Sequence, residues 1–215
     1  MSISTYDELK AAVANWLHRD DLAARVPEFI AMGEAVLNRK LRTVDMEARA
    51  TASMPTDSRY MGLPAGFLEM QSMYVQDPIQ EMVYVEASVL RDYVDTETAT
   101  GMPHLFTIKD EIELNCIPDQ AYTLEMHYSK RYDIASDSTN WLLTNYPELY
   151  LHASLSAAAL FVNDDARIGT IKALLSEGIE EVNTQEARKR GAQLAYMRVD
   201  AALTESGSFN IATGY

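Results

Sequence analysis

The sequence predicts an α+β protein that is mainly helical: a four-helix bundle with an inserted antiparallel β-rich module and an extended C-terminal arm. Two observations lead to this fold class. Apolar residues recur at helical spacing near both ends of the chain, whereas in the middle they alternate with polar ones, as in half-buried strands. Each terminal pair of helices buries little surface alone, so the two pairs are expected to pack together into one bundle.

Residues 1–46 are expected to form a helical hairpin, the first half of the bundle. The apolar side chains of Tyr6–Leu17 fall on one helical stripe, and Ser4 or Thr5 can cap that helix. Pro27 suits the first turn of a second helix, which ends in basic side chains where a helix favours cations.

Residues 47–137 are expected to form the β-rich insertion. Turn chemistry is dense here, as in the Leu-Pro-Ala-Gly sequence of residues 63–66. Apolar and polar residues alternate along Ile112–Cys116 and Tyr122–Tyr128, which is typical of half-buried antiparallel strands. A short helix is expected between two of the strands, over Ala87–Val94.

Residues 138–191 are expected to form the second helical pair of the bundle. Leu151 and Leu155 lie on one apolar face of a helix whose alanines permit the close approach of another helix. A basic run and Gly191 then predict the end of the last long helix. Residues 192–215 are interpreted as more strand or helix followed by an arm.

Composition argues against two classes of partner, nucleic acid and membrane. The chain has 215 residues, of which 47% are apolar, so it can bury a substantial core. Its 32 acidic and 18 basic side chains give a net charge of −14, which disfavours general binding to phosphate backbones. The N-terminus does not resemble a signal peptide, and no apolar run approaches the roughly 18 residues that cross a bilayer. We therefore expect a protein made in the cytoplasm and without a membrane partner.

Motifs for catalysis or cofactors are few. The chain contains no G-x-S-x-G, no G-x-x-x-x-G-K-[ST] and no G-x-G-x-x-G. Cys116 is expected to be a buried structural thiol, because it alternates inward on its strand. Glu148 and His152 are four residues apart on a helix and could share a metal ion, but this spacing is more common as ordinary surface polarity. We assign no catalytic, metal-binding or cofactor-binding residue.

Two other function classes remain open. Paired carboxylates, as at residues 164–165, 180–181 and 111 with 113, are what a carboxylate-based hydrolase such as a cell-wall glycosidase uses. The net charge would also suit an acidic DNA mimic that blocks a basic protein. A solvated acidic face is the simpler interpretation of the carboxylates, since sequence spacing alone does not bring them together.

Two features indicate protein contacts. The chain has 11 methionines and 12 tyrosines, residue types that suit interfaces, although methionine fills irregular cores equally well. The last ten residues interleave Phe209, Ile211 and Tyr215 with small side chains, a pattern that favours an arm docking on a partner over a floppy tail.

The order of four stretches resembles a known family, the head-to-tail adaptor (connector) proteins of tailed bacteriophages. The stretches are Thr5–Leu22, Val26–Arg42, Leu63–Met70 and Tyr146–Leu155. The resemblance implies a non-enzymatic structural virion protein: a ring, commonly dodecameric, that sits between the portal protein and the tail tube or nozzle protein. It further implies assembly in the host cytoplasm and a role in virion assembly and genome ejection at the head-tail junction. Double-stranded DNA would pass through the ring without sequence-specific binding, and an acidic lumen suits that passage.

Two contact sites are expected in such a protein. By analogy with the C-terminal extensions of these adaptors, the portal-binding arm would consist of Phe209, Asn210, Ile211 and Tyr215. Because loops make adaptable contact surfaces, the tail-facing loop would consist of Asp77, Pro78, Ile79 and Gln80.

Overall fold

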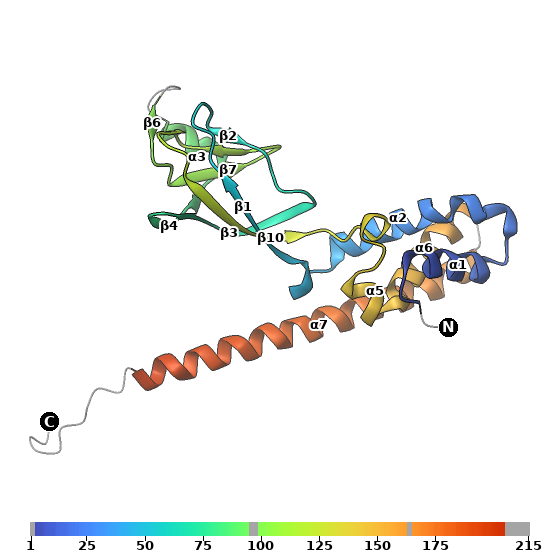
Figure 1. Ribbon diagram of the computed structural model, residues 1–215. Coiled ribbons are helices and arrows are strands. Elements are labelled where there is room, and N and C mark those ends of the chain that lie inside the picture. The colour runs from blue at the N-terminus through green and yellow to red at the C-terminus, as the bar shows by residue number, and fades with distance from the viewer. Residues whose placement is uncertain (1–2, 95–98, 163–164, 205–215) are drawn as a thin grey trace, which may run out of the picture. The chain divides into compact units, whose positions relative to one another are not determined.

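A computed structural model describes residues 3–94, 99–162 and 165–204 and divides the chain into two compact units (Figure 1). We call residues 1–44 with 137–215 the helical unit, and residues 45–136 the β unit. The part of the chain that the structure describes is 51% helical and 24% strand, so the protein is α+β overall.

The prediction of a four-helix bundle is wrong. Within the described ranges the chain forms seven α-helices and ten strands in three sheets. The difference originates in α6 (Pro147–Val162), in which nine of 16 side chains are buried and which has no continuous polar face. Such a helix is stable when other helices surround it, so α6 takes a central position instead of one of four equivalent positions.

The helices α1 and α2 both pack on α6. The first, α1 (Tyr6–Leu17), starts with a capping box in which the Thr5 hydroxyl accepts a hydrogen bond from the backbone N–H of Glu8. A 3₁₀ turn, η1 (Asp20–Arg25), leads into α2 (Val26–Lys40), which has proline in its first turn.

A glycine lets α2 approach α6 closely. A Cβ atom built on Gly33 would lie 2.7 Å from the backbone nitrogen of Ser154 and 2.8 Å from the carbonyl carbon of Ala153. Real Cβ atoms essentially never come this close to backbone atoms. The small-residue face of α6 and Gly33 therefore set the spacing of these two helices.

Two short helices, α4 (Ile134–Asp137) and α5 (Trp141–Asn145), precede α6, and α7 (Asp165–Thr204) follows it. The expected helix end at Gly191 is wrong, because α7 continues through this glycine for 13 further residues. An interior glycine costs only about 1 kcal/mol relative to alanine, which a long helix tolerates.

A buried polar network links α2, α6 and the start of α5. Tyr150 is fully buried, and its hydroxyl donates a 2.8 Å hydrogen bond to the Glu34 carboxylate. The Asn140 side-chain amide donates to the same hydroxyl over 2.6 Å, while its oxygen caps α5 by accepting from the N–H of Leu143. The network holds three elements of the helical unit in one arrangement.

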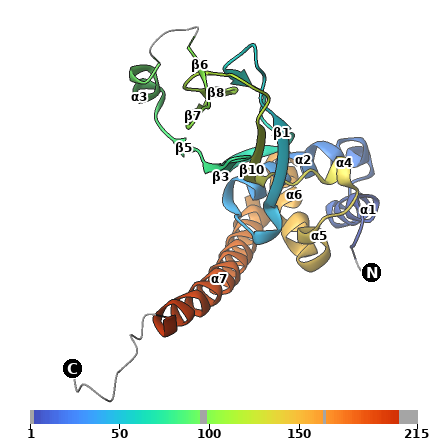
Figure 2. The ribbon, with the colours of Figure 1, turned by 60° about the vertical axis from the view of Figure 1, so that its left-hand side comes forward.

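The β unit contains one four-stranded antiparallel sheet, of which β1, β10 and β3 are labelled in Figure 2. A second four-stranded sheet and a two-stranded sheet complete the unit. In spatial order, the first sheet is β1 (Glu47–Ser53), β10 (Thr123–Lys130), β3 (Phe67–Gln76) and β4 (Ile79–Glu81). The second is β2 (Tyr60–Met61), β8 (Ile112–Leu114), β7 (Leu105–Ile108) and β5 (Val83–Tyr84), and the third is β6 (Thr100–Gly101) with β9 (Ile117–Pro118).

The expectation of a purely antiparallel module needs correction. The β5–β7 and β6–β9 pairs are parallel. Parallel neighbours need a longer crossover between them, and α3 (Ala87–Asp92) lies in the connection from β5 to β7, over most of the range where a short helix is expected.

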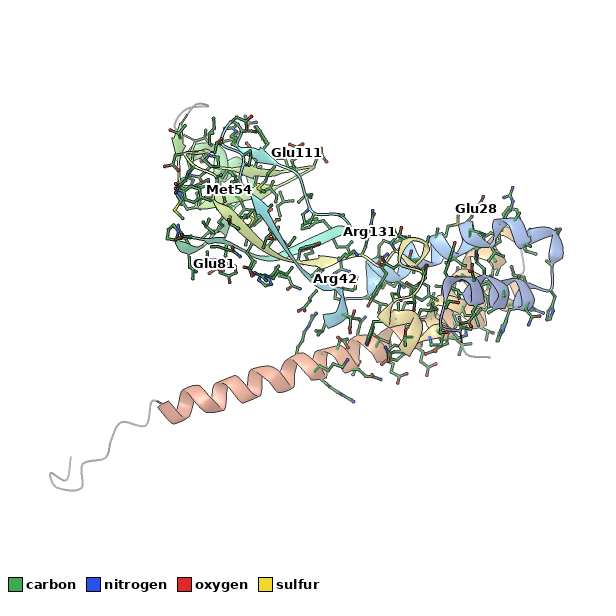
Figure 3. The ribbon with its side chains drawn as sticks, viewed as in Figure 1. Glu28, Arg42, Met54, Glu81, Glu111 and Arg131 are labelled. Carbon is green, nitrogen blue, oxygen red and sulfur yellow. The ribbon has the colours of Figure 1, made fainter. Side chains whose placement is uncertain are left out.

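Methionines fill the core of the β unit. Met54, Met61, Met73, Met82 and Met126 are all buried in one apolar cluster with side chains of the two larger sheets. Met54 is labelled in Figure 3. Of the two roles open to these methionines, the described structure supports core filling, since their flexible side chains adapt to the irregular space between short strands.

Candidate functional site: a cationic groove on the helical unit

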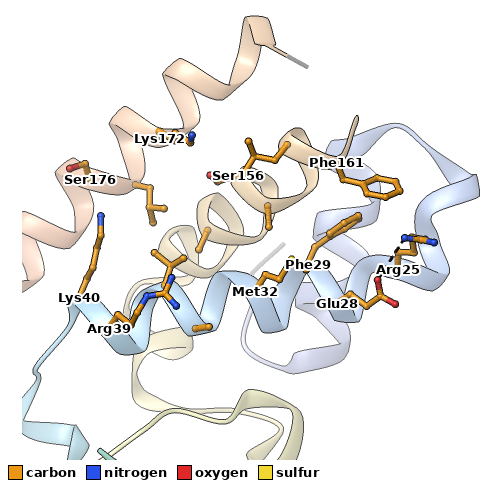
Figure 4. A pocket seen from close by; sticks show the side chains of 16 residues that line it. Arg25, Glu28, Phe29, Met32, Arg39, Lys40, Ser156, Phe161, Lys172 and Ser176 are labelled. Atoms are coloured by element: carbon orange, nitrogen blue, oxygen red, sulfur yellow. Dashed lines mark ion pairs between the residues drawn. The ribbon is translucent and has the colours of Figure 1, made fainter. Parts of the chain in front are cut away.

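A groove of about 880 Å³ lies between α2, α6 and α7 of the helical unit and is drawn in Figure 4. Phe29 and Leu175 contribute buried apolar surface to it. Met32, Leu160 and Phe161 line it while remaining 59%, 56% and 51% exposed. Exposure of three large apolar side chains in one groove is typical of a surface that another protein covers.

Aromatic and ionic contacts fix one end of the groove. The rings of Phe29 and Phe161 lie 5.7 Å apart between centroids and are tilted by 50°. The guanidinium carbon of Arg25 lies 4.8 Å from the centroid of the Phe161 ring, and Arg25 also forms a 4.0 Å ion pair with Glu28. These contacts hold Phe161 in place at the mouth of the groove.

The groove is positively charged although the protein is acidic. Four cations, Arg25, Arg39, Lys40 and Lys172, line it together with a single carboxylate, that of Glu28. Arg39, Lys40 and Lys172 are exposed, and their side chains make no ion pair with the residues that the structure describes. The local charge is therefore +3 at neutral pH.

Most of the negative charge belongs to the other unit. The β unit holds 16 acidic and six basic side chains, a net charge of −10, which leaves −4 for the helical unit. The groove thus differs in sign from the rest of the molecule. A surface of this kind attracts a negatively charged partner.

A smaller hollow of about 360 Å³ lies between α1, α6 and α7, with Trp16 and Leu174 exposed at its edge. His152 also lines it, and its Nδ1 atom is buried without a hydrogen-bond partner among the described residues. Burial lowers the pKa of His152, while the nearby Glu148 carboxylate partly opposes that shift. The imidazole of His152 is therefore neutral at pH 7.

The described residues contain no group of three or more His, Cys, Asp or Glu side chains that could hold a metal ion, so the Glu148 and His152 pair has no third ligand there.

Cys116 differs from expectation. It lies in a bend after β8 rather than on the strand itself, and it is half-buried rather than buried, because the strand ends at Leu114. Burial and the neighbouring Asp119 carboxylate raise the pKa of the thiol. A thiol with a raised pKa is a poor nucleophile at neutral pH.

The carboxylate pairs do not converge in the described structure. Glu113 is buried and pairs with Arg59 at 3.3 Å, whereas Glu111 is exposed. Residues 180 and 181 are both exposed on α7, and the side chains of residues 164 and 165 lie outside the described part. Among the other carboxyl groups, Glu125 has a strongly shifted pKa: hydrogen bonds from Arg49, Gln76 and His127 lower it to about 2.

Of the two contact sites expected from the sequence, the structure describes the tail-facing loop but not the portal-binding arm. Asp77 and Pro78 form the turn between β3 and β4, joined by a cis peptide bond, and Gln80 pairs with Val75. Ile79 is 87% exposed at this turn, so the four residues do lie together at the surface. The arm residues Phe209, Asn210, Ile211 and Tyr215 lie outside the described residues.

The cationic groove itself is absent from the sequence-based expectations. The helix dipole alone explains the basic residues near the end of α2 there, and no expectation brings α2 and α7 together. A signal exists in the spacing: Arg25, Phe29, Met32, Val36 and Arg39 recur every three or four residues along a second stripe of α2. That stripe lines one groove with α7 only because both helices pack on α6.

None of the described helices is long and apolar enough to cross a membrane. The model of one family, described as SU10 adaptor protein, matches residues 4–202. The chain belongs to the SU10 adaptor protein family, which confirms its resemblance to the phage head-to-tail adaptors. No curated protein matches the chain.

Membership of this family carries a coarse function. The family consists of structural phage adaptors, so the chain is a bacteriophage structural protein of virion assembly. The family also implies a position at the head-tail junction, in contact with portal and tail proteins.

Proposed function

We propose that this protein forms a closed ring of twelve copies between the portal protein and the tail tube or nozzle protein. The observation that carries the proposal is the family match over residues 4–202. A ring needs two different surfaces on each copy, which meet head to tail and close by rotation. In this proposal the protein assembles in the host cytoplasm and takes part in genome ejection.

The ring would line the path of the DNA. A net charge of −14 makes the protein repel the phosphate backbone, so that packaged DNA slides past without sticking. The acidic β unit and the exposed carboxylates of α7 support this part of the proposal. A carboxylate-based hydrolase would instead need two convergent carboxylates and activity in dilute solution, without any portal protein.

We propose that the arm around Phe209, Ile211 and Tyr215 binds the portal protein. Replacing these three residues by serine is expected to abolish capture of the portal protein of the same genome in a pull-down. The matched control replaces Ser206 and Ser208 by alanine, which leaves the apolar side chains intact. Unchanged capture by the triple variant would remove the arm from the portal contact.

We propose that the turn Asp77 to Gln80 contacts the tail protein. Ile79 is 87% exposed, so Ile79→Ser is expected to leave the thermal midpoint unchanged while weakening binding to the tail protein. The control is Leu174→Ser, at an exposed apolar site on α7 of the helical unit. Equal effects of the two variants on tail binding would argue against a specific role of the turn.

A further inference from the structure

Exposed apolar side chains are concentrated at two places. Twelve large apolar side chains are exposed among the described residues, and seven of them belong to two surfaces. Three, Met32, Leu160 and Phe161, line the cationic groove. The other four, which lie between residues 83 and 93 of the β unit, are Val83, Tyr84, Val89 and Tyr93.

The second surface has the opposite charge. We call residues 81–93 the acidic segment, because Glu81, Glu86 and Asp92 are exposed there beside one exposed cation, Arg91. Its charge of −2 faces solvent together with its four apolar side chains. The groove combines apolar side chains with a charge of +3, so the two surfaces are complementary in both respects.

The acidic segment is held in a defined conformation. Its strand β5 is the edge strand of the second sheet, paired on one side to β7. The Tyr84 ring packs edge-on against Phe106 at 5.7 Å between centroids, which orients it. An edge strand with exposed apolar side chains is a surface that proteins normally cover.

We propose that the cationic groove of one copy binds the acidic segment of a second copy, so that the contact repeats head to tail around the ring. This inference rests on the proposed ring and names the two surfaces that form it. Contact between two identical grooves would bring +3 against +3, and contact between two acidic segments would bring −2 against −2. Only the heterologous pairing joins opposite charges, and heterologous contacts are those that generate rings.

Charge reversal on both surfaces tests the pairing. The groove variant carries Arg39→Glu, Lys40→Glu and Lys172→Glu, and the segment variant carries Glu81→Lys, Glu86→Lys and Asp92→Lys. All six sites are exposed, so both full-length variants are expected to keep the wild-type circular dichroism spectrum. The matched control reverses three exposed α7 carboxylates outside both surfaces, Glu177→Lys, Glu180→Lys and Glu181→Lys.

The readout is native mass, with the portal protein of the same genome present and absent. Each variant alone presents like charges at every contact, so its self-association is expected to weaken about 100-fold, whereas the control assembles as the wild type does. In an equimolar mixture the two variants can alternate around the ring. Every contact then joins a positive surface to a negative one. This mixture is therefore expected to regain the wild-type mass.

Several results would overturn the inference. If each variant alone assembles like the wild type, the ring stands but these surfaces do not form it. If the variants fail to assemble and their mixture does not recover, the two surfaces do not contact each other. If a variant loses its helical spectrum, single reversals at Lys172 and Glu86 replace the triple ones, with the same recovery required. If the wild type itself never assembles, the proposed ring fails, and with it this contact.

Discussion

Replacing Gly33 by alanine tests the close approach of α2 to α6, which shapes both the helical unit and the groove. The new Cβ would lie 2.7 Å from the backbone nitrogen of Ser154 and 2.8 Å from the carbonyl carbon of Ala153. Backbone atoms cannot rotate away as a side chain can, so the two helices must separate. Overpacking of this kind costs about 1–3 kcal/mol.

The net effect combines two opposing contributions. Alanine stabilises a helix interior by about 1 kcal/mol relative to glycine, which offsets part of the clash. We therefore expect Gly33→Ala to lower the free energy of unfolding by up to about 2 kcal/mol. Urea unfolding followed by circular dichroism at the helical minimum measures this change.

A matched control separates the clash from the helix propensity. A Cβ on Gly169 of α7 has no neighbour within 4 Å among the described atoms. Gly169→Ala is therefore expected to raise stability by about 0.5–1 kcal/mol. Equal stabilisation by both substitutions would refute the close packing of α2 on α6.

Three further predictions concern polar groups. Tyr150→Phe removes the hydrogen bond to the buried Glu34 carboxylate and should cost about 1–3 kcal/mol in urea unfolding, whereas a loss below 0.5 kcal/mol would contradict the buried network. The Glu125 carboxyl should titrate near pH 2 by NMR, and Arg49→Ala should move its pKa back toward 4.5; an unchanged titration in the variant would show that Arg49 is not the main cause. Burial raises the pKa of Glu186, but hydrogen bonds from a lysine and a backbone N–H outweigh it, and the pKa is lowered from 4.5. Because the folded-state pKa lies below the unfolded one, this carboxylate stabilises the fold above about pH 4.5 and loses that effect as the pH falls through the folded-state value. Glu186→Gln should therefore flatten the dependence of the thermal midpoint on pH between 6 and 3, and an unaltered dependence would exclude this assignment.

Local patterns of the helical unit could be predicted because they depend on neighbouring residues. The cap at Thr5 and the stripe that follows it yield α1 with the expected ends, Tyr6 and Leu17. The proline of the first turn likewise marks the start of α2. Helix caps and first-turn prolines depend only on residues that are close together in the sequence.

The arrangement of the helices could not be predicted in the same way. The polar-poor sequence of α6 is consistent with a bundle helix and with a central helix, and only the packing partners decide between them. Gly191 also illustrates the limit, because a basic run followed by glycine is typical of a helix end, yet α7 passes through it. In the β unit, alternation identifies strands but does not determine whether β5 and β7 run parallel.

For the candidate contact sites, too, local features could be predicted from the sequence, whereas the packing of distant residues could not. The turn Asp77 to Gln80 is local and could be read from its proline, whereas the groove combines Arg39 of α2, Phe161 of α6 and Lys172 of α7. Residues this far apart in the chain form one surface only through the packing of three helices. Charge totals give the overall sign but not the segregation of positive charge into the groove.

The proposed function requires this protein to join a ring at the portal. The most direct test is the native mass of the purified protein, measured alone and after mixing with the portal protein of the same genome. We expect the chain to join a large complex with the portal, in a fixed number of copies set by closure of the ring. A small species whose mass is indifferent to the portal protein would contradict it.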